Sequence, residues 1–271
     1  MLPAFIIIGT MKGGTSSLYH YLDKHPDIGM SSIKETDFFR TNEDYAKGIE
    51  WYKNLFDKKA KILGEASPNY TKRHLFPGVP ERMYAVLPRV KLIYLLRDPI
   101  ERIVSHYIHS YSHRRERSSF IEAITKPNNN YILTSKYFYQ LQVFIERFSS
   151  ENILLIESEE LRKNTDKVIN IILEFIGADL CFHSHFFEKH FHQSSEKLRR
   201  PSIVLYASRY IKNAKARKVL TFLLPLLPKK KGLIEPPVIS TENRNILIEH
   251  LSPDIEKLRA YSGLSFSSWS L

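Results

Sequence analysis

A stretch near the start of the chain, FIIIGTMKGGTSSLYHYL at residues 5–22, carries the residue types needed to bind a phosphate group. Glycines let backbone N–H groups converge on an oxyanion without obstruction by Cβ atoms, and a helix N-terminus adds partial positive charge. One lysine and three hydroxyl side chains supply further donors. The residues that we expect around the phosphate are contiguous: Lys12, Gly13, Gly14, Thr15, Ser16 and Ser17. We therefore expect a nucleotide to bind here; a glycine-rich turn without a ligand is the structural alternative.

The position of the lysine decides which nucleotide this loop favours. Gly9 and Gly14 have the spacing of the triphosphate-binding pattern G-x-x-x-x-G-K-[ST], but Thr15 occupies the position of its lysine. A triphosphate usually needs that lysine and Mg²⁺, so the displaced lysine disfavours a P-loop kinase, which is the second hypothesis. GTMKGGTSSL instead resembles the 5′-phosphosulfate loop of sulfotransferases, which use 3′-phosphoadenosine-5′-phosphosulfate (PAPS) and release adenosine 3′,5′-bisphosphate (PAP). The resemblance implies that Lys12 stabilises the leaving phosphate and that no metal is needed.

A second motif, RDPIERIVSHY, follows the apolar run at residues 90–96. Arg97 lies where that strand should end, and Asp98 and Pro99 are suited to begin a helix that carries Ser105. A guanidinium and a hydroxyl suit a terminal phosphate, although a structural pair between Arg97 and a carboxylate is an equal alternative. The motif is similar to the 3′-phosphate motif of sulfotransferases, which implies that Arg97 and Ser105 bind the 3′-phosphate of the donor.

Sulfuryl transfer also requires a base that accepts the proton of the acceptor. Glu35 in IKETDFF follows the second predicted strand, although a surface glutamate beside Lys34 is the simpler interpretation of the pattern alone. HPDIGMSSIKETDFF is similar to heparan sulfate N- and 3-O-sulfotransferases, and the resemblance implies that Glu35 is the general base. EASPNY at residues 65–70 matches a motif like EKTPAY of those enzymes, with Ala66 in place of a lysine that assists acceptor binding in some members.

Two further features resemble the family more loosely. QSSEKLRRPS is similar to the basic loop that closes over the nucleotide, which would assign Lys197 and Arg199 to donor binding; a solvated basic turn is the alternative. Tyr137 matches a tyrosine that related enzymes place near the nucleotide, but it also belongs to an apolar helical stripe and is as well explained as a core residue.

The elements that must position these residues alternate between strands and helices. We expect strands at residues 5–8, 28–30, 61–64, 90–96 and 152–157. We expect helices to alternate with these strands, including residues 45–56 and 165–176 with Thr165 as N-cap, and a tail helix at 240–251 followed by a separate helix from Ser252. This order predicts an α/β, P-loop-like, three-layer fold with a central parallel sheet flanked by helices. We interpret residues 1–271 as one domain whose helical or lid-like C-terminal part begins at about residue 183.

Composition narrows the class of protein without choosing the ligand. The chain has 271 residues, 43% hydrophobic residues and a formal net charge of +11, so we expect a globular protein that attracts polyanions. A non-enzymatic protein that binds polyanions or a membrane surface is the third hypothesis. The single cysteine, Cys181, excludes an intrachain disulfide, and the histidines at residues 183–192 lack a metal-binding pattern.

The expected partners are the nucleotide donor and a carbohydrate, glycan or glycolipid acceptor, with no nucleic acid and no metal. No basic leader or long apolar span occurs, so we expect a cytoplasmic protein. The apolar, lysine-flanked residues 216–232 leave two alternatives open: a helix packed over the cleft, or a peripheral contact with the membrane. The pattern predicts neither the oligomeric state nor the identity of the acceptor.

Overall fold

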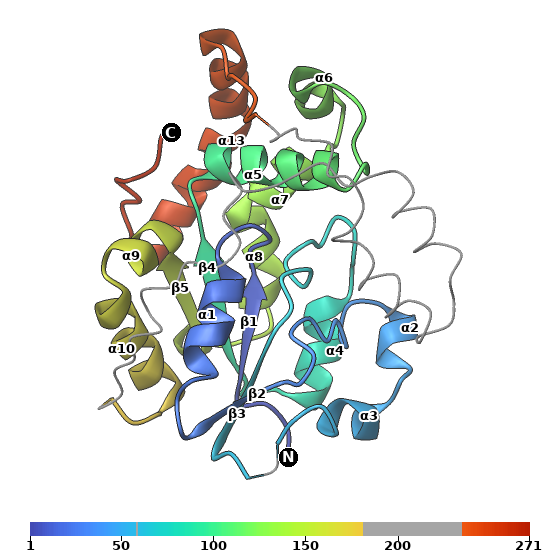
Figure 1. Cartoon of the computed structure of the whole chain (residues 1–271), viewed down its shortest axis with the longest axis vertical. Coiled ribbons are helices and arrows are strands. Elements are labelled where there is room, and N and C mark those ends of the chain that lie inside the picture. The colour runs from blue at the N-terminus through green and yellow to red at the C-terminus, as the bar shows by residue number, and fades with distance from the viewer. Residues whose placement is uncertain (58, 181–234) are drawn as a thin grey trace, which may run out of the picture.

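A five-stranded parallel sheet forms the centre of the protein (Figure 1). The computed structural model describes residues 1–57, 59–180 and 235–271. The strands are β1 (Phe5–Gly9), β2 (Ile28–Met30), β3 (Ile62–Ala66), β4 (Lys91–Leu96) and β5 (Ile153–Glu157). Their order in the sheet is β2-β3-β1-β4-β5, with β1 between β3 and β4. The predicted parallel sheet is confirmed, and each strand lies within two residues of its expected position.

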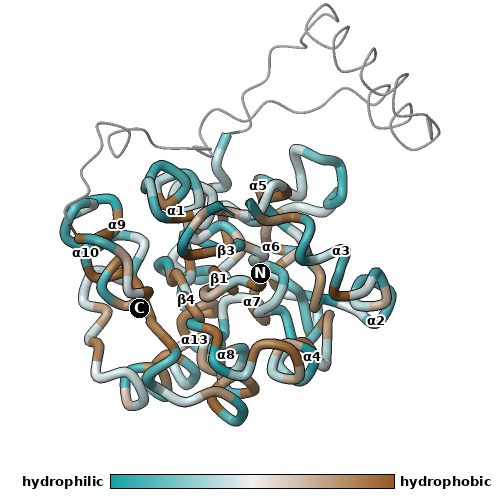
Figure 2. The backbone as a smooth tube through the Cα atoms, turned by 90° about the horizontal axis from the view of Figure 1, so that it is seen from below, coloured by the Kyte–Doolittle hydropathy of each residue, from teal (hydrophilic) through white to brown (hydrophobic). Residues whose placement is uncertain are grey.

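Helices cover both faces of the sheet and produce three layers. One face packs against α1 (Thr15–Leu22), α9 (Ser158–Lys163) and α10 (Thr165–Ile176). The other packs against α3 (Ile49–Lys53), α4 (Val79–Val86), α8 (Tyr137–Ile145) and the second half of α13 (Thr241–Ser262). Figure 2 shows the hydrophobic strands enclosed by helices with hydrophilic outer stretches. The expected three-layer α/β fold is therefore confirmed.

Alternating side chains of β1 explain why both faces must be covered. Phe5 and Ile7 belong to the core beneath α1 and α10, whereas Ile6 and Ile8 belong to the core on the other face. All four side chains are fully buried. A continuous apolar run is the pattern expected for a parallel strand that has no solvent-exposed face.

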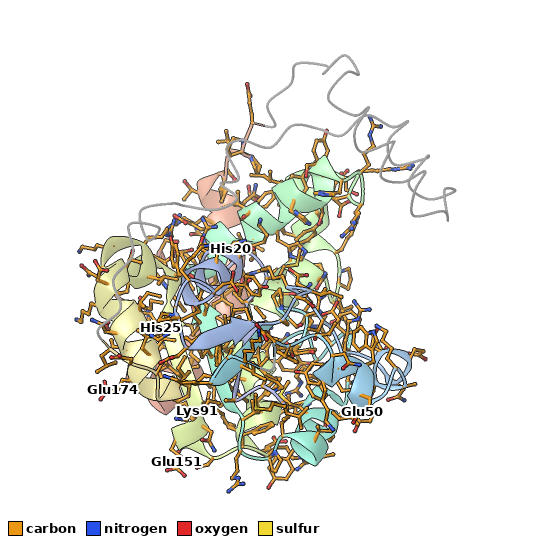
Figure 3. All side chains as sticks on the ribbon, turned by 60° about the horizontal axis from the view of Figure 1, so that its bottom comes forward. His20, His25, Glu50, Lys91, Glu151 and Glu174 are labelled. Carbon is orange, nitrogen blue, oxygen red and sulfur yellow. The ribbon has the colours of Figure 1, made fainter. Side chains whose placement is uncertain are left out.

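A third apolar cluster lies beyond the carboxyl edge of the sheet. It joins α5 (Pro99–Ser112), α6 (Phe120–Thr125), α7 (Asn130–Ser135) and the first half of α13. At the opposite edge, Lys91 donates a hydrogen bond to the Phe175 carbonyl oxygen on α10, and Figure 3 shows Lys91 on that side of the molecule.

None of the helices in the described part of the chain combines the length and the apolar character that a membrane span requires.

Three helix predictions were wrong in their boundaries. The helix expected at residues 45–56 is two short ones, α2 (Asn42–Tyr45) and α3, because Gly48 between them has a φ of 85°. The two helices expected after residue 240 form one helix, α13, which continues through Pro253. The N-cap of α10 is Asn164, and the Thr165 hydroxyl instead donates to the Leu161 carbonyl oxygen at 2.8 Å.

Candidate active site

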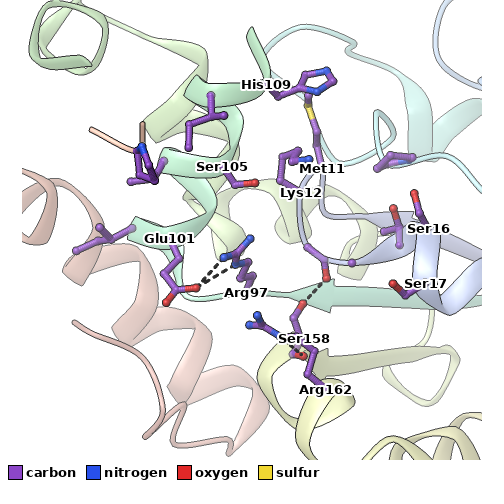
Figure 4. Close-up of a pocket in the computed structure, with 18 of the residues that line it drawn as sticks. Met11, Lys12, Ser16, Ser17, Arg97, Glu101, Ser105, His109, Ser158 and Arg162 are labelled. Carbon is purple, nitrogen blue, oxygen red and sulfur yellow. Dashed lines mark hydrogen bonds and ion pairs between the residues drawn. The ribbon is translucent and has the colours of Figure 1, made fainter. Parts of the chain in front are cut away.

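The carboxyl edge of the sheet opens into a cavity of about 1420 Å³. It lies where the chain leaves β1 and β4, which is the usual ligand position in an open α/β sheet. Every described residue that the sequence predicted for the site lines this cavity: Lys12, Gly13, Gly14, Thr15, Ser16, Ser17, Glu35, Arg97 and Ser105. Figure 4 shows Lys12, Arg97 and Ser105 around the same space. Lys197, Arg199 and residues 216–232 lie outside the described residues.

The loop between β1 and α1 bends sharply before the helix begins. Lys12 has a φ of 71° and Gly14 a φ of 98°, a region of backbone conformation that side chains with a Cβ seldom adopt. A Cβ on Gly13 would lie 2.8 Å from the Leu95 carbonyl oxygen, so β4 leaves no room for a side chain there. Ser158 on α9 donates a hydrogen bond to the Gly13 carbonyl oxygen (Figure 4). The loop is thus fixed from two neighbouring elements.

The N-terminus of α1 is left without a side-chain cap. Gly14 is its N-cap residue, no side chain accepts a hydrogen bond there, and the first turn holds no acidic residue. The first N–H groups of a helix have no partner within the helix, and they carry its partial positive charge. Ser16 and Ser17 lie beside these groups in the cavity wall. This end of the cavity therefore suits an anion.

Arg97, directly after β4, and Ser105, on α5, face the cavity from the other side. Asp98 caps α5 as predicted, because its carboxylate accepts hydrogen bonds from the N–H groups of Ile100 and Glu101, both at 2.9 Å. Arg97 forms an ion pair with Glu101 at 2.7 Å, which is the structural pairing that the sequence had left open. Ser105 is only 2% exposed. Since Glu101 is largely exposed, its attraction for Arg97 is weak, and a phosphate could replace it.

Tyr137 lies in the core and does not line the cavity. Its ring is fully buried and stacks edge-to-face against Tyr94 and Trp269. The hydroxyl donates a 2.6 Å hydrogen bond to the Arg97 carbonyl oxygen. The core interpretation of this tyrosine is therefore correct, with one consequence for the site: Tyr137 fixes the backbone from which Arg97 projects.

Glu35 belongs to an exposed segment that is anchored from behind. Its side chain is 46% exposed and forms an ion pair with Lys34 at 2.9 Å. Phe38 and Phe39 are fully buried, and Phe38 stacks on Tyr52 with ring centroids 4.4 Å apart. The carboxylate of Glu35 is thus accessible in the cavity, whereas the segment that carries it is held by apolar packing.

A buried glutamate supports this segment, and reasoning from the sequence missed it. Glu65 at the end of β3 is fully buried and accepts a hydrogen bond from the Thr36 hydroxyl. Ser67 donates a weaker hydrogen bond to the same carboxylate oxygen at 3.4 Å, and the Asp37 N–H donates to Ser67 Oγ at 3.1 Å. Burial raises the pKa of Glu65 to about 7, although the hydrogen bond from Thr36 opposes this increase. The matching position in EASPNY was the only signal in the sequence.

The cavity wall also contains a lysine that no motif indicated. Lys72 is 5% exposed, and its ammonium group donates to Asn69 Oδ1 and approaches Met11 Sδ, both at 2.9 Å. Arg115, Arg162 and Arg244 line other parts of the wall. Within the described ranges, no group of three or more histidine, cysteine, aspartate or glutamate side chains could hold a metal ion. The arrangement suits a ligand with several negative charges.

Comparison with known proteins adds to this geometry. The sequence model of the family described as "Sulfotransferase domain" matches residues 2–216. The chain is 47% identical over 111 residues to the membrane-associated sulfotransferase kil1 of Dictyostelium discoideum, covering 39% of this chain and 22% of that protein. It is 31% identical over 199 residues to the bifunctional heparan sulfate N-deacetylase/N-sulfotransferase 4 of Mus musculus, covering 65% of this chain and 22% of that protein. The chain thus spans about a fifth of the length of these curated relatives.

Solved structures resemble the fold over the whole chain. A crystal structure of a sulfotransferase from Alicyclobacillus acidocaldarius has a TM-score of 0.72 at 23% sequence identity and covers 100% of both chains. The sulfotransferase STF9 of Mycobacterium avium has a TM-score of 0.52 at 11% identity and covers 96% of this chain and 76% of its own. At these identities the likeness concerns the fold alone.

Proposed function

The chain belongs to the sulfotransferase domain family, and from that membership we propose that it transfers a sulfuryl group from PAPS to a hydroxyl or amine of a carbohydrate acceptor. The observation that carries this proposal is that one cavity collects the loop of Lys12, the pair Arg97 and Ser105, and the carboxylate of Glu35. A donor with phosphates on both its 5′ and 3′ positions needs the first two of these groups, and an acceptor hydroxyl needs the third.

The donor would lie with its 5′-phosphosulfate on the loop and its 3′-phosphate at β4. Lys12, the backbone of Gly13 and Gly14, and the start of α1 would bind the 5′ end. Gly13 has no room for a Cβ, which supports a cradle that needs bare backbone. At the other end, Arg97 would exchange its ion pair with Glu101 for the 3′-phosphate, and Ser105 would add a hydroxyl.

In the transfer step, the acceptor oxygen or nitrogen forms a bond to sulfur while the bond from sulfur to the 5′-phosphate oxygen breaks. The electron pair of the breaking bond stays on that phosphate oxygen, where Lys12 stabilises the charge. Glu35 takes the proton that the acceptor loses. Glu35 thus acts on the side of the bond that forms, and Lys12 acts on the side of the bond that breaks. PAP is the nucleotide product.

The acceptor class rests on the relatives that are named heparan sulfate N-sulfotransferases, of which the mouse protein is 31% identical over 199 residues. A carbohydrate, including a glycan carried on a lipid, is the acceptor that this kinship supports. The name of the membrane-associated Dictyostelium relative supports a peripheral membrane location as part of the same proposal. Ala66 stands where some of the resembling enzymes have a lysine, so we propose no particular glycan.

Calorimetric titration in EDTA with PAP and with AMP tests the assignment of the donor. The two ligands differ by the 3′-phosphate, and loss of a charge-assisted bidentate contact costs on the order of 1.5–3 kcal/mol, so PAP should bind roughly 10- to 150-fold more tightly. Arg97→Ala should remove the difference. Arg147→Ala is the control, because Arg147 pairs with Glu81 and is not part of the cavity wall. Equal affinity of the wild type for both nucleotides, or tight binding of ATP only with Mg²⁺, would favour the kinase hypothesis.

A further inference from the structure

Lys72 is a buried cation that forms no ion pair within the described residues. It lies on the turn after β3, lines the cavity and is 5% exposed. Its hydrogen-bond partners are the neutral side chains of Asn69 and Met11, each at 2.9 Å. Among the described residues, none of the ion pairs with a carboxylate includes Lys72. A buried ammonium group in such surroundings is costly unless an anion joins it.

The surroundings of Lys72 increase this cost. Arg102 on α5 is fully buried and donates to the Met11 carbonyl oxygen at 3.4 Å, so two buried cations contact the same residue. Burial and, after it, the charge of Arg102 lower the pKa of Lys72 to about 8. The charges of Glu35 and Asp37 raise the pKa in part, and that of Arg115 lowers it again. The fold therefore maintains positive charge here against its own stability, which is typical of a ligand site.

The contacts of Lys72 also locate it between the two halves of the proposed reaction. Met11 directly precedes Lys12 in the loop. Asn69 donates from Nδ2 to the Asp37 carboxylate at 3.2 Å, and Asp37 lies two residues after Glu35. Asn69 and Glu35 line the same cavity as Met11 and Lys12. The ammonium group of Lys72 thus bridges the loop of the leaving phosphate and the segment of the base.

We propose that Lys72 is a second catalytic cation, which binds the oxygens of the sulfuryl group as it moves from the 5′-phosphate oxygen to the acceptor. This inference rests on the proposed function. Lys12 receives the charge that develops on the leaving phosphate, and Glu35 accepts the acceptor's proton. Lys72 holds the remaining reacting part, the three sulfuryl oxygens, which carry negative charge both before and during transfer.

Titration with two nucleotides that differ only in the sulfuryl group tests this role. PAPS carries the group and PAP lacks it. Lys72→Met should weaken PAPS binding roughly 10- to 100-fold, the effect of losing one charge-assisted hydrogen bond, and change PAP binding by less than about threefold. Lys53→Met is the matched control, because Lys53 pairs with Glu50 on α3 and does not line the cavity. It should alter neither affinity.

A second measurement separates this role from a structural one. Because Lys72→Met removes a buried charge that lacks an ion pair, the ligand-free variant should unfold at the same temperature as the wild type or at a higher one. If Lys72→Met does not fold, the same two titrations can be made with Lys72→Gln, which keeps a hydrogen-bond donor for Asn69. Equal losses for both nucleotides, or no loss for PAPS, would overturn the role of Lys72 alone. Failure of the wild type to bind either nucleotide would instead contradict the proposed function.

Discussion

At the scale of single residues, the two glutamates of the site differ most in their surroundings. Glu35 is 46% exposed and lines the cavity, whereas Glu65 is fully buried. The Thr36 hydroxyl connects them, because it follows Glu35 in the chain and donates to Glu65. We therefore propose that Glu35 transfers the proton and that Glu65 positions its segment. Stability rather than activity is the direct measure of the second role.

The pH dependence of stability should report Glu65. Its pKa is about 7 in the folded chain and about 4.5 in ordinary surroundings, so the folded chain holds a proton between these values that the unfolded chain has released. The free energy of unfolding therefore falls by up to about 3 kcal/mol as pH rises through this window. It recovers by the same amount as pH falls again.

Urea unfolding of the wild type and of Glu65→Gln, each at about pH 5 and about pH 8, checks this expectation. Subtracting the free energies of unfolding of the two proteins removes the contribution of the other titrating groups. From the lower to the higher pH, Glu65→Gln should become more stable relative to the wild type by roughly 2 kcal/mol. A difference that is the same at both pH values would show that Glu65 does not titrate in this window.

At the scale of elements, the long C-terminal helix holds a part of the sheet-covering layer in place. Asp254 on α13 is 8% exposed, and its carboxylate accepts hydrogen bonds from the N–H groups of Phe138 and Tyr139 at 2.9 and 2.8 Å. These N–H groups belong to the first turn of α8, whose N-cap residue Lys136 provides no side-chain hydrogen bond. A residue 115 positions away in sequence thus caps this helix.

Removal of this distant cap should destabilise the protein. Asp254→Ala leaves two N–H groups of α8 without their acceptor, and the expected loss in free energy of unfolding is about 1–3 kcal/mol. Asp254→Asn keeps one oxygen acceptor and should lose less. Glu256→Ala, at an exposed position of the same helix, is the control for urea titrations. If Asp254→Ala and Glu256→Ala cost the same, α8 does not depend on this contact.

The elements that the sequence predicted best are those whose pattern is local. Apolar runs such as residues 90–96 indicate buried strands, and Asp98 followed by Pro99 indicates the start of α5. The continuity of α13 through Pro253 was missed because a proline tolerated within a helix resembles a proline that begins one. The short helices α6 and α7 are held by contacts with α5 and α13, and such tertiary support leaves no periodic signal in the sequence.

Across the whole molecule, part of the net charge of +11 is concentrated around the cavity. Basic residues from well-separated parts of the chain line its wall: Lys12, Lys72, Arg97, Arg115, Arg162 and Arg244. Motif resemblance identified the first and third of these from the sequence. Lys72 could not be found in that way, because the proposal for it depends on burial and on contacts with Met11 and Asn69 that only the folded chain creates.

We propose that this molecule transfers a sulfuryl group from PAPS to a carbohydrate. The most direct test is mass spectrometry of glycan acceptors incubated with the protein and PAPS in EDTA, searching for products heavier by one SO₃ group. We expect such a product together with stoichiometric PAP, and a turnover roughly 10²–10⁴-fold lower for Glu35→Gln, which should still bind PAP. Phosphorylated products that form from ATP only with Mg²⁺, with none from PAPS, would contradict it.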